Sequence, residues 1–319
     1  MERYDQMTRE RVVETIERTK SRSGWAVERI LRALGIAASS YYAWCVRPGG
    51  PDWHRAFARC KPLIEEIAAV RAYALTHPTD GYRRLAWMML DEDVAAFSES
   101  SVYRILRDAG LTQRWNSCSS VAGTVPAKPR SPDEQWHTDL MYLWVNGRWY
   151  FFIAVLDAYS RYIVHWELLL SMTGGDVTAV MHRAIELTPE AKPRIIHDRG
   201  VQFTGREFRS LVKHFGLEDI KIRVNHPQSN GVYERFNGST RQEGLRDIQL
   251  RDVHHAREVL SRWVDEYNHR RLHSALGYLP PIEYYRGNPE GRQRIRKAKL
   301  EAARNHRMTI NLQESNQAA

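Results

Sequence analysis

Three apolar runs between residues 135 and 170 constrain the fold more than any other feature of the sequence. They are QWHTDLMYLWV, RWYFFIAVLDA and RYIVHWELLL, all rich in aromatic and β-branched residues. The dipeptides NG and YS separate them, and short turns of this kind join antiparallel strands. The pattern therefore predicts a three-stranded antiparallel meander.

The segments after the meander extend it into a mixed sheet. Helices are expected over residues 175–188 and 204–215, with short strands at RIIHD (194–198) and at 220–224. Two more helices are expected, one ending near residue 245 and one over 252–270. The last has an apolar face made of Ala256, Val259, Leu260, Trp263, Val264 and Tyr267. Three strands followed by alternating helices and strands predict an α/β fold.

The first 115 residues indicate an all-α region. A helix ending at Gly35, a helix over 61–76, a helix from about Gly81 and a helix between Ser98 and Gly110 are expected. Ser98 is a candidate N-cap and Gly110 a candidate stop. The core-facing residues expected in 61–76 are Ile64, Ile67, Ala68 and Leu75.

The short helices before residue 115 allow two interpretations. Arg83, Arg84, Arg104 and Arg107 are expected to be exposed, which fits a helix-turn-helix that binds DNA. An ordinary three-helix bundle with solvated arginines fits this segment equally well.

Changes in composition along the chain predict its segments. These are an N-terminal helical segment (1–50), a second helical region that fits a helix-turn-helix (51–115), a linker (116–133), an α/β core (134–287) and a basic tail (288–319). The linker is rich in Ser, Pro, Gly and Lys. The tail is expected to be a charged extension, flexible or helical, that carries Arg292, Arg294, Arg296, Lys297, Lys299, Arg304 and Arg307.

The formal net charge is +9, which indicates a polyanionic partner, nucleic acid first and an anionic membrane second. No run approaches the roughly 18 apolar residues that span a bilayer, and the N-terminus lacks the apolar core of a signal peptide. The 3 cysteines are far apart, so no disulfide framework or zinc site is expected. We therefore expect a soluble protein of a reducing compartment.

The helix that ends near residue 245 has an unusual polar face. At helical spacing, one side carries Asn230, Gly231, Glu234, Asn237, Gly238 and Arg241, while Val232, Tyr233 and Phe236 lie on another and anchor the helix. Solvent is the simple explanation for a polar face. However, glycine costs about 1 kcal/mol relative to alanine inside a helix, so two glycines beside a glutamate indicate that another group approaches this backbone.

Three acidic residues stand where polar groups are least expected. Asp139 lies inside the first strand, Asp198 ends the strand RIIHD, and Glu234 is on the polar face. Such carboxylates are costly unless they are paired or bind a cation, and hard oxygen ligands favour Mg²⁺ or Mn²⁺. A strand-end aspartate is more often a cap or an ion-pair partner, and Asp157 is expected to be one, bonded to backbone or to Arg161.

Three sequence blocks carry a family resemblance. WHTDLMYL, IHDRGVQFT and HPQSNGVYERFNGSTRQEGL resemble the catalytic blocks of the retroviral-integrase-like DDE transposases. RRLHSALGYLPPIEYY resembles the closing segment of bacterial insertion-sequence transposases in that group. HPTDGYRRLAWMML and SSVYRILRDAGL resemble the helix-turn-helix of their downstream-frame protein. The resemblance covers about residues 25–286.

The resemblance implies an RNase H-like core with two Mg²⁺ ions, for which Mn²⁺ substitutes. Asp139, Asp198 and Glu234 match the metal-ligand positions, and Arg241 matches the basic position that contacts the DNA end. Asn230 and Gly231 open the helix where that end passes. The implied reaction is strand cleavage by water, which frees a 3′-hydroxyl, and then attack of that hydroxyl on a second phosphodiester.

The resemblance also implies partners. They are the terminal repeats of the element and target DNA, a homo-oligomer on paired ends, and an upstream-frame protein, but no membrane. The implied location is the bacterial cytoplasm, at the nucleoid. The ligands of the N-terminal zinc module of retroviral integrases are missing from the sequence, which favours a bacterial element. His137 and His197, which flank the aspartates, are interpreted as structural.

Two rival functions remain at this point. One is an RNase H-like nuclease that only hydrolyses DNA, and the helix-turn-helix segments count against it. The other is a DNA-binding repressor or domesticated factor whose core is only a scaffold, and the presence of all three carboxylates counts against it.

Overall fold

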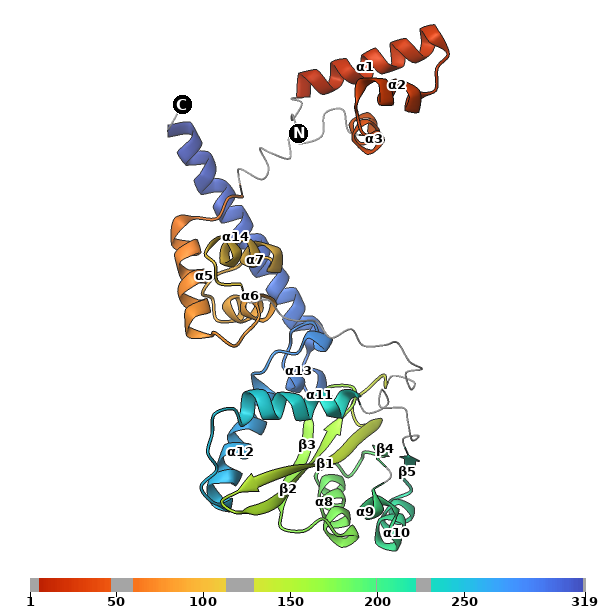
Figure 1. Ribbon diagram of the computed structural model, residues 1–319, viewed down its shortest axis with the longest axis vertical. Coiled ribbons are helices and arrows are strands. Elements are labelled where there is room, and N and C mark those ends of the chain that lie inside the picture. The colour runs from red at the N-terminus through yellow and green to blue at the C-terminus, as the bar shows by residue number, and fades with distance from the viewer. Residues whose placement is uncertain (1–5, 47–59, 113–128, 199, 222–230, 318–319) are drawn as a thin grey trace. The chain divides into compact units, whose positions relative to one another are not determined.

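The computed structural model describes residues 6–46, 60–112, 129–198, 200–221 and 231–317 (Figure 1). The chain divides into two compact units. The first combines Met1–Ala68 with Leu300–Ala319, and the second is Ala69–Lys299. Most of the predicted linker and the strand positions 222–224 lie outside the described residues. None of the helices in the described part is long and apolar enough to span a bilayer.

The N-terminal helices α1 (Gln6–Ser23), α2 (Val27–Leu34) and α3 (Ala38–Val46) share a small apolar core. Its buried side chains are Ile16, Ile30, Leu31 and Tyr41. Gly35 ends α2 in the left-handed region at φ 66°, as its position after an apolar run predicts.

The expected inner face of α5 (Ile64–Thr76) is wrong. Ile64 is 86% exposed and Leu75 is 65% exposed, whereas Leu63 and Val70 are buried. The reason is a charge on the inner side: Glu66 accepts a hydrogen bond of 2.7 Å from the buried Arg307. In the sequence, an acidic residue that pairs with a buried arginine cannot be distinguished from one that faces solvent, so the inward position of Glu66 was not predicted.

The second unit contains a five-stranded sheet in the order β3-β2-β1-β4-β5. The strands are β1 (Gln135–Val145), β2 (Arg148–Asp157), β3 (Ile163–Leu169), β4 (Arg194–His197) and β5 (Glu218–Lys221). The first three pair antiparallel, and β4 pairs parallel to both β1 and β5. Asn146 and Gly147, at φ 41° and 82°, form the tight turn that the NG dipeptide predicts. The predicted meander and mixed sheet are confirmed.

Helices cover both faces of the sheet (Figure 1). On one face, α8 (Gly174–Leu187), α9 (Val201–Thr204) and α10 (Arg206–Phe215) pack on Trp136, Ile153 and Val155. On the other, α11 (Gly231–Ser239) and α12 (Val253–His269) pack on Met141 and Phe152. All six apolar residues predicted for the inner face of α12 are buried. The short helix α9 is not predicted by the sequence.

The second unit also contains α6 (Tyr82–Asp91) and α7 (Glu99–Asp108). Ser98 caps α7 by accepting a hydrogen bond of 3.3 Å from the Ser101 backbone N–H, and Gly110 follows at φ 70°. Val102, Ile105 and Leu106 are buried. The second unit is completed by a π-helical turn (Thr240–Gly244), a 3-10 turn (Ser274–Leu276) and α13 (Pro281–Tyr285).

The basic C-terminal stretch forms one long helix, α14 (Pro289–Gln317), which corresponds to the helical form of the expected extension. Its charge is not all solvated. Arg296 is 2% exposed and donates to both carboxylate oxygens of Asp91, at 2.9 and 2.5 Å. It also donates to the Tyr278 carbonyl at 2.7 Å and lies 4.9 Å from the Trp87 ring centre. Arg296 is therefore a buried structural residue.

Candidate active site

Asp139 lies in the middle of β1, on the face of the sheet that α11 and α12 cover. Side chains alternate along a strand, so Asp139 lies on the same side as Met141 and Leu143, which pack against those helices. Its carboxylate accepts a hydrogen bond of 2.8 Å from the Leu140 backbone N–H. Asp139 is half-buried, whereas its neighbour Thr138 is fully buried.

Asp198 directly follows β4, and the strand register brings it level with Asp139. His137 pairs with Ile196 in the parallel β1–β4 ladder. Two residues further along each strand are Asp139 and Asp198, on strands that run about 4.8 Å apart. Ile195 packs on the α8 side of the sheet. Because side chains alternate along a strand, Ile196 and Asp198 lie on the opposite side, the α11 side, as Asp139 does. The Gly200 backbone N–H donates to the Asp198 carboxylate at 2.9 Å.

Tyr233 fixes the helix that carries Glu234. Its hydroxyl donates to the Asp139 carbonyl at 2.7 Å and accepts from the Ala154 backbone N–H at 3.1 Å. The side chain is fully buried, and burial raises the pKa of its hydroxyl above the ordinary range. The next residue, Glu234, is exposed on the helix surface. The sequence shows Tyr233 as an apolar anchor, but its hydrogen bond to the Asp139 backbone depends on the strand pairing.

The carboxylates supply oxygen ligands only, which is the donor set that Mg²⁺ and Mn²⁺ prefer. Within the described ranges, no three His, Cys, Asp or Glu side chains are close enough together to hold a metal ion. The fold brings Asp139 and Asp198 to one level of the sheet and places Glu234 on the helix bonded to the Asp139 backbone. The assignment of the three as metal ligands stays a prediction. Asn230 lies outside the described residues, and Gly231 begins α11.

The two histidines beside the aspartates are packed inside the protein. His197 is fully buried, stacks 4.5 Å from the Phe203 ring and bonds Asp219 through Nε2 at 2.7 Å. It lies on the opposite face of the sheet from Asp198. His137 is 2% exposed, with Nε2 3.0 Å from the Gln135 amide nitrogen. These contacts support the structural interpretation of both side chains.

Asp157 has the structural role that the sequence predicts. It is fully buried, and its carboxylate accepts backbone N–H bonds from Asp133 at 2.9 Å and from Ser160 at 2.7 Å. Burial raises the pKa of this carboxyl, although the hydrogen bonds oppose that shift. Asp157 therefore stabilises the turn after β2.

The helix changes its winding before it reaches Arg241. It is α-helical to Ser239 and π-helical over Thr240–Gly244, so Arg241 lies in a π-helical turn rather than in the regular helix that the sequence predicts. Trp263 on α12 packs against this turn, and its indole N–H donates to the Thr240 hydroxyl at 3.1 Å. A Cβ on Gly244 would lie only 2.6 Å from the Trp263 ring, so only glycine fits there. Arg241 itself is exposed.

Comparisons with known proteins identify the family of the chain. Models of the integrase core domain family match residues 129–227 and 216–281. An insertion element IS407 protein of 31.7 kDa from Burkholderia multivorans is 30% identical over 226 residues, which cover 69% of this chain and 80% of the relative. The chain belongs to the bacterial insertion-sequence transposases of the DDE/integrase family. It is therefore a polynucleotidyl transferase.

Two further proteins are similar to this transposase. The transposase InsD of insertion element IS2 from Escherichia coli is 27% identical over 283 residues, which cover 82% of this chain and 92% of the relative. The HTLV-2 integrase catalytic core domain in complex with magnesium is 15% identical, with a TM-score of 0.41 over 49% of this chain and 98% of that one.

The arginines predicted for the helix-turn-helix of the transposase differ in environment. Arg83, Arg104 and Arg107 are exposed, as expected. The expectation is wrong for Arg84, whose side chain is only 24% exposed. It forms ion pairs with Asp80 at 2.6 Å and with Glu243 at 3.3 Å. The sequence gives no sign of the Glu243 contact, because the two residues are far apart in the chain.

Proposed function

We propose that this transposase cleaves DNA at the ends of its element and joins the freed strands to target DNA at Asp139, Asp198 and Glu234. The observation that carries the proposal is the placement of the three carboxylates. The β1–β4 register brings the two aspartates level, and Tyr233 bonds the helix of Glu234 to the Asp139 backbone.

The three carboxylates are the proposed ligands of two Mg²⁺ ions, for which Mn²⁺ substitutes. When bound, such a pair of ions activates the attacking oxygen and stabilises the leaving oxygen of a phosphodiester. Asp139 lies in β1 and accepts the Leu140 backbone N–H, and Asp198 follows β4 and accepts the Gly200 backbone N–H, so both carboxylates are oriented by backbone. Glu234, on the covering helix α11, is the third proposed ligand.

The chain's own basic residues hold the DNA in this proposal. Arg241 is exposed and pairs with a phosphate of the element end. The proposal assigns Gly231, which begins α11, and Asn230, which lies outside the described residues, to the passage of the DNA end. Arg83, Arg104 and Arg107 contact the terminal repeat through phosphates or base edges. Arg84 is not a proposed DNA contact, because its side chain pairs with Glu243.

The proposed partners are the terminal repeats of the element, the target DNA and further copies of this chain on paired ends. An upstream-frame protein is a further proposed partner. Because the substrate is bacterial DNA, we place the reaction in the cytoplasm, at the nucleoid.

The test is a strand-transfer assay with purified protein, the element's own terminal DNA and Mg²⁺. We expect a joined product that disappears with EDTA and with Asp198→Asn, while binding of the terminal DNA is retained. The loss of product in Asp198→Asn should be on the order of a thousandfold or more, because a metal ligand stabilises charge in the transition state. Glu234→Gln should behave in the same way.

Three outcomes would contradict the proposal in different ways. Cleavage without joining would favour a hydrolytic nuclease, and DNA binding without cleavage or joining would favour a repressor. Loss of DNA binding in Glu234→Gln would show that Glu234 is not a metal ligand.

A further inference from the structure

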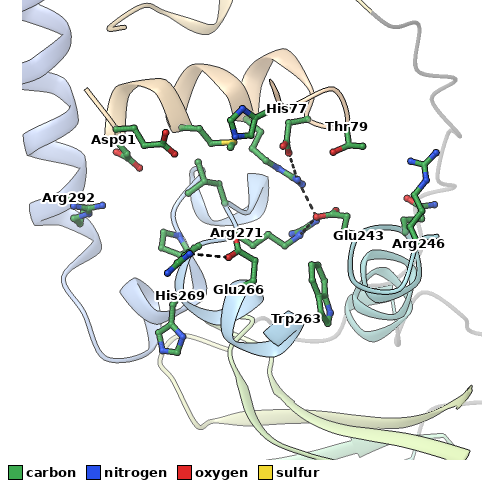
Figure 2. A pocket seen from close by; sticks show the side chains of 18 of the residues that line it. His77, Thr79, Asp91, Glu243, Arg246, Trp263, Glu266, His269, Arg271 and Arg292 are labelled. Atoms are coloured by element: carbon green, nitrogen blue, oxygen red, sulfur yellow. Dashed lines mark hydrogen bonds and ion pairs between the residues drawn. The ribbon is translucent and has the colours of Figure 1, made fainter. Parts of the chain in front are cut away.

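A ladder of charged side chains lies away from the carboxylates, between α6 and the π-helical turn. Asp80 pairs with Arg84 at 2.6 Å, Arg84 with Glu243 at 3.3 Å, and Glu243 with Arg271 at 2.6 Å. Figure 2 shows Arg271 and Glu243 pointing toward one another in the cavity that these residues line. The ladder connects α6 and the residue just before it to the π-helical turn and to Arg271, which follows α12.

Glu243 is the central member of this ladder. The Arg271 guanidinium donates two hydrogen bonds to the Glu243 carboxylate, from Nε to Oε2 at 2.7 Å and from Nη2 to Oε1 at 2.6 Å. The side chain of Arg271 is 12% exposed and that of Glu243 is 30% exposed. Burial alone would raise the pKa of Glu243, but the bonds from Arg271 and the charge of Arg84 hold it below the ordinary value. Glu243 is therefore ionised and firmly oriented.

Glu243 stands two residues after Arg241 in the same π-helical turn. Arg271 also donates to the Ser239 hydroxyl at 3.1 Å, so one guanidinium holds both ends of the turn. Trp263 holds the turn from α12 through Thr240. π-Helical turns are rare and are often found at functional sites. The direction in which Arg241 leaves the protein is thus set by Arg271 and Trp263.

Arg84 extends this fixed turn to α6. A cavity of about 600 Å³ lies beside the contact, and residues from α6, the π-helical turn and α12 line it. Its lining includes both signs of charge, with Asp80, Asp91 and Glu266 as well as Arg246 and Arg292. The cavity is therefore not suited to an anion. The charged residues at its wall are better explained as a structural connection between α6 and the π-helical turn, which we call the joint.

We propose that Glu243 is a positioning residue that joins α6 to the turn carrying Arg241, so that DNA bound by α6 and α7 aligns its end with Asp139, Asp198 and Glu234. The inference rests on the proposed function, because it takes Arg241 and the α6–α7 region as DNA contacts. Glu243 acts through Arg84 on one side and through the turn on the other.

The joint is tested first without catalysis, by amide hydrogen exchange on the full chain. In Glu243→Gln, exchange in α6 and in residues 240–244 should rise together, by about tenfold, because a bond to a charged group is lost on each side. Arg84→Gln keeps the grip of Arg271 and should raise exchange in α6 alone. Unchanged α6 exchange in both variants would overturn the proposal.

Glu266→Gln is the matched control. Glu266 lines the same cavity, and its side chain is 50% exposed and lies 3.8 Å from Arg270 on its own helix. This variant removes one negative charge from the cavity without touching the ladder, so exchange in α6 and in the turn should stay at the wild-type level.

The second measurement is strand transfer with precut terminal DNA at saturating concentration. Glu243→Gln and Arg84→Gln should each slow transfer by about tenfold with DNA affinity nearly unchanged, and the double variant should be no slower than Glu243→Gln. Full transfer by both single variants, or additive losses, would contradict the joint. Absence of transfer in the wild type would reject the proposed function, and hydrogen exchange would still decide the joint.

Discussion

The sheet and helix α6 are held by different chemistry. On the sheet, Met141, Phe152 and Phe236 meet in an apolar cluster beneath α11 and α12. Helix α6 packs apolar residues toward α7, but arginines connect it to the rest of its unit, Arg296 through Asp91 and Arg84 through Glu243. The comparison shows that apolar contacts leave a periodic pattern in the sequence. Buried ionic contacts leave none, because in the sequence their residues look the same as ordinary charged surface residues.

The largest expected effect on stability is at Arg296. Arg296→Met removes both bonds to Asp91 and leaves the carbonyls of Gly277 and Tyr278 without this donor. Breaking a buried ion pair on one side costs about 3–5 kcal/mol. Urea unfolding followed by tryptophan fluorescence measures the loss.

Arg294→Met is the control for Arg296, because Arg294 is exposed on the same helix. Its substitution should change the free energy of unfolding by no more than about 0.5 kcal/mol. Equal effects of the two variants would show that α6 is not held by the buried arginine.

Tyr233→Phe tests the hydrogen bonds that connect α11 to the sheet. It removes only the hydroxyl that bridges the Asp139 carbonyl and the Ala154 N–H. Leaving buried backbone groups unpaired costs about 1–3 kcal/mol, which thermal unfolding measures. Strand transfer should also slow, because the helix of Glu234 loses its bond to the strand of Asp139.

Tyr103→Phe provides the comparison for Tyr233, since Tyr103 is 40% exposed on α7. Wild-type stability is expected for this variant. If Tyr233→Phe were equally stable and fully active, the hydroxyl bridge would have no role in placing Glu234.

A smaller effect is expected on the pH dependence of stability, through His273, which lies next to Arg271 of the charged ladder. Burial, followed by the charges of Arg271, Arg84 and Arg161, lowers the pKa of His273 well below its ordinary value of 6.5. Between 6.5 and the lower folded value, the unfolded chain gains a proton that the folded protein does not. Stability should therefore fall as pH drops below about 6.5. In His273→Gln, the melting temperature should depend less on pH in this range, and an unchanged dependence would contradict the assignment.

The smallest effect on stability is expected at Arg107. Its side chain is 56% exposed and pairs with the neighbouring Asp108 at 2.8 Å. Arg107→Ala should therefore leave the free energy of unfolding within about 0.5 kcal/mol of the wild type. If Arg107 contacts a phosphate, the salt dependence of binding to the terminal DNA should fall by about one unit of slope. An unchanged slope would remove Arg107 from the DNA contacts.

The sequence predicted the apolar parts of the fold well. The three runs of the meander correspond to β1, β2 and β3, and the α12 face from Ala256 to Tyr267 is buried as expected. These features depend on local periodicity, which the chain carries within each segment. The inner face of α5 was wrong because its partner is a buried arginine from the other end of the chain.

The candidate site was predicted from residue type and neighbouring motif, but its geometry was not. Asp139, Asp198 and Glu234 stand out as acidic residues in strands and on a polar helix face. Their common level depends on the pairing of β1 with β4, which no local pattern encodes. The π-helical turn that contains Arg241 was missed, because its contact with Trp263 comes from a different helix.

By itself, the sequence determined the order of the elements, the apolar faces of the strands and of α12, and the family to which the transposase belongs. These depend on local periodicity and on motifs that lie within one segment. Only the tertiary structure decided which charges are buried, how the helix turns before Arg241, and that Glu243 meets both Arg84 and Arg271. The reason is that a charged side chain is stable inside a protein only beside its partner, and here the chain fold brings the partners together.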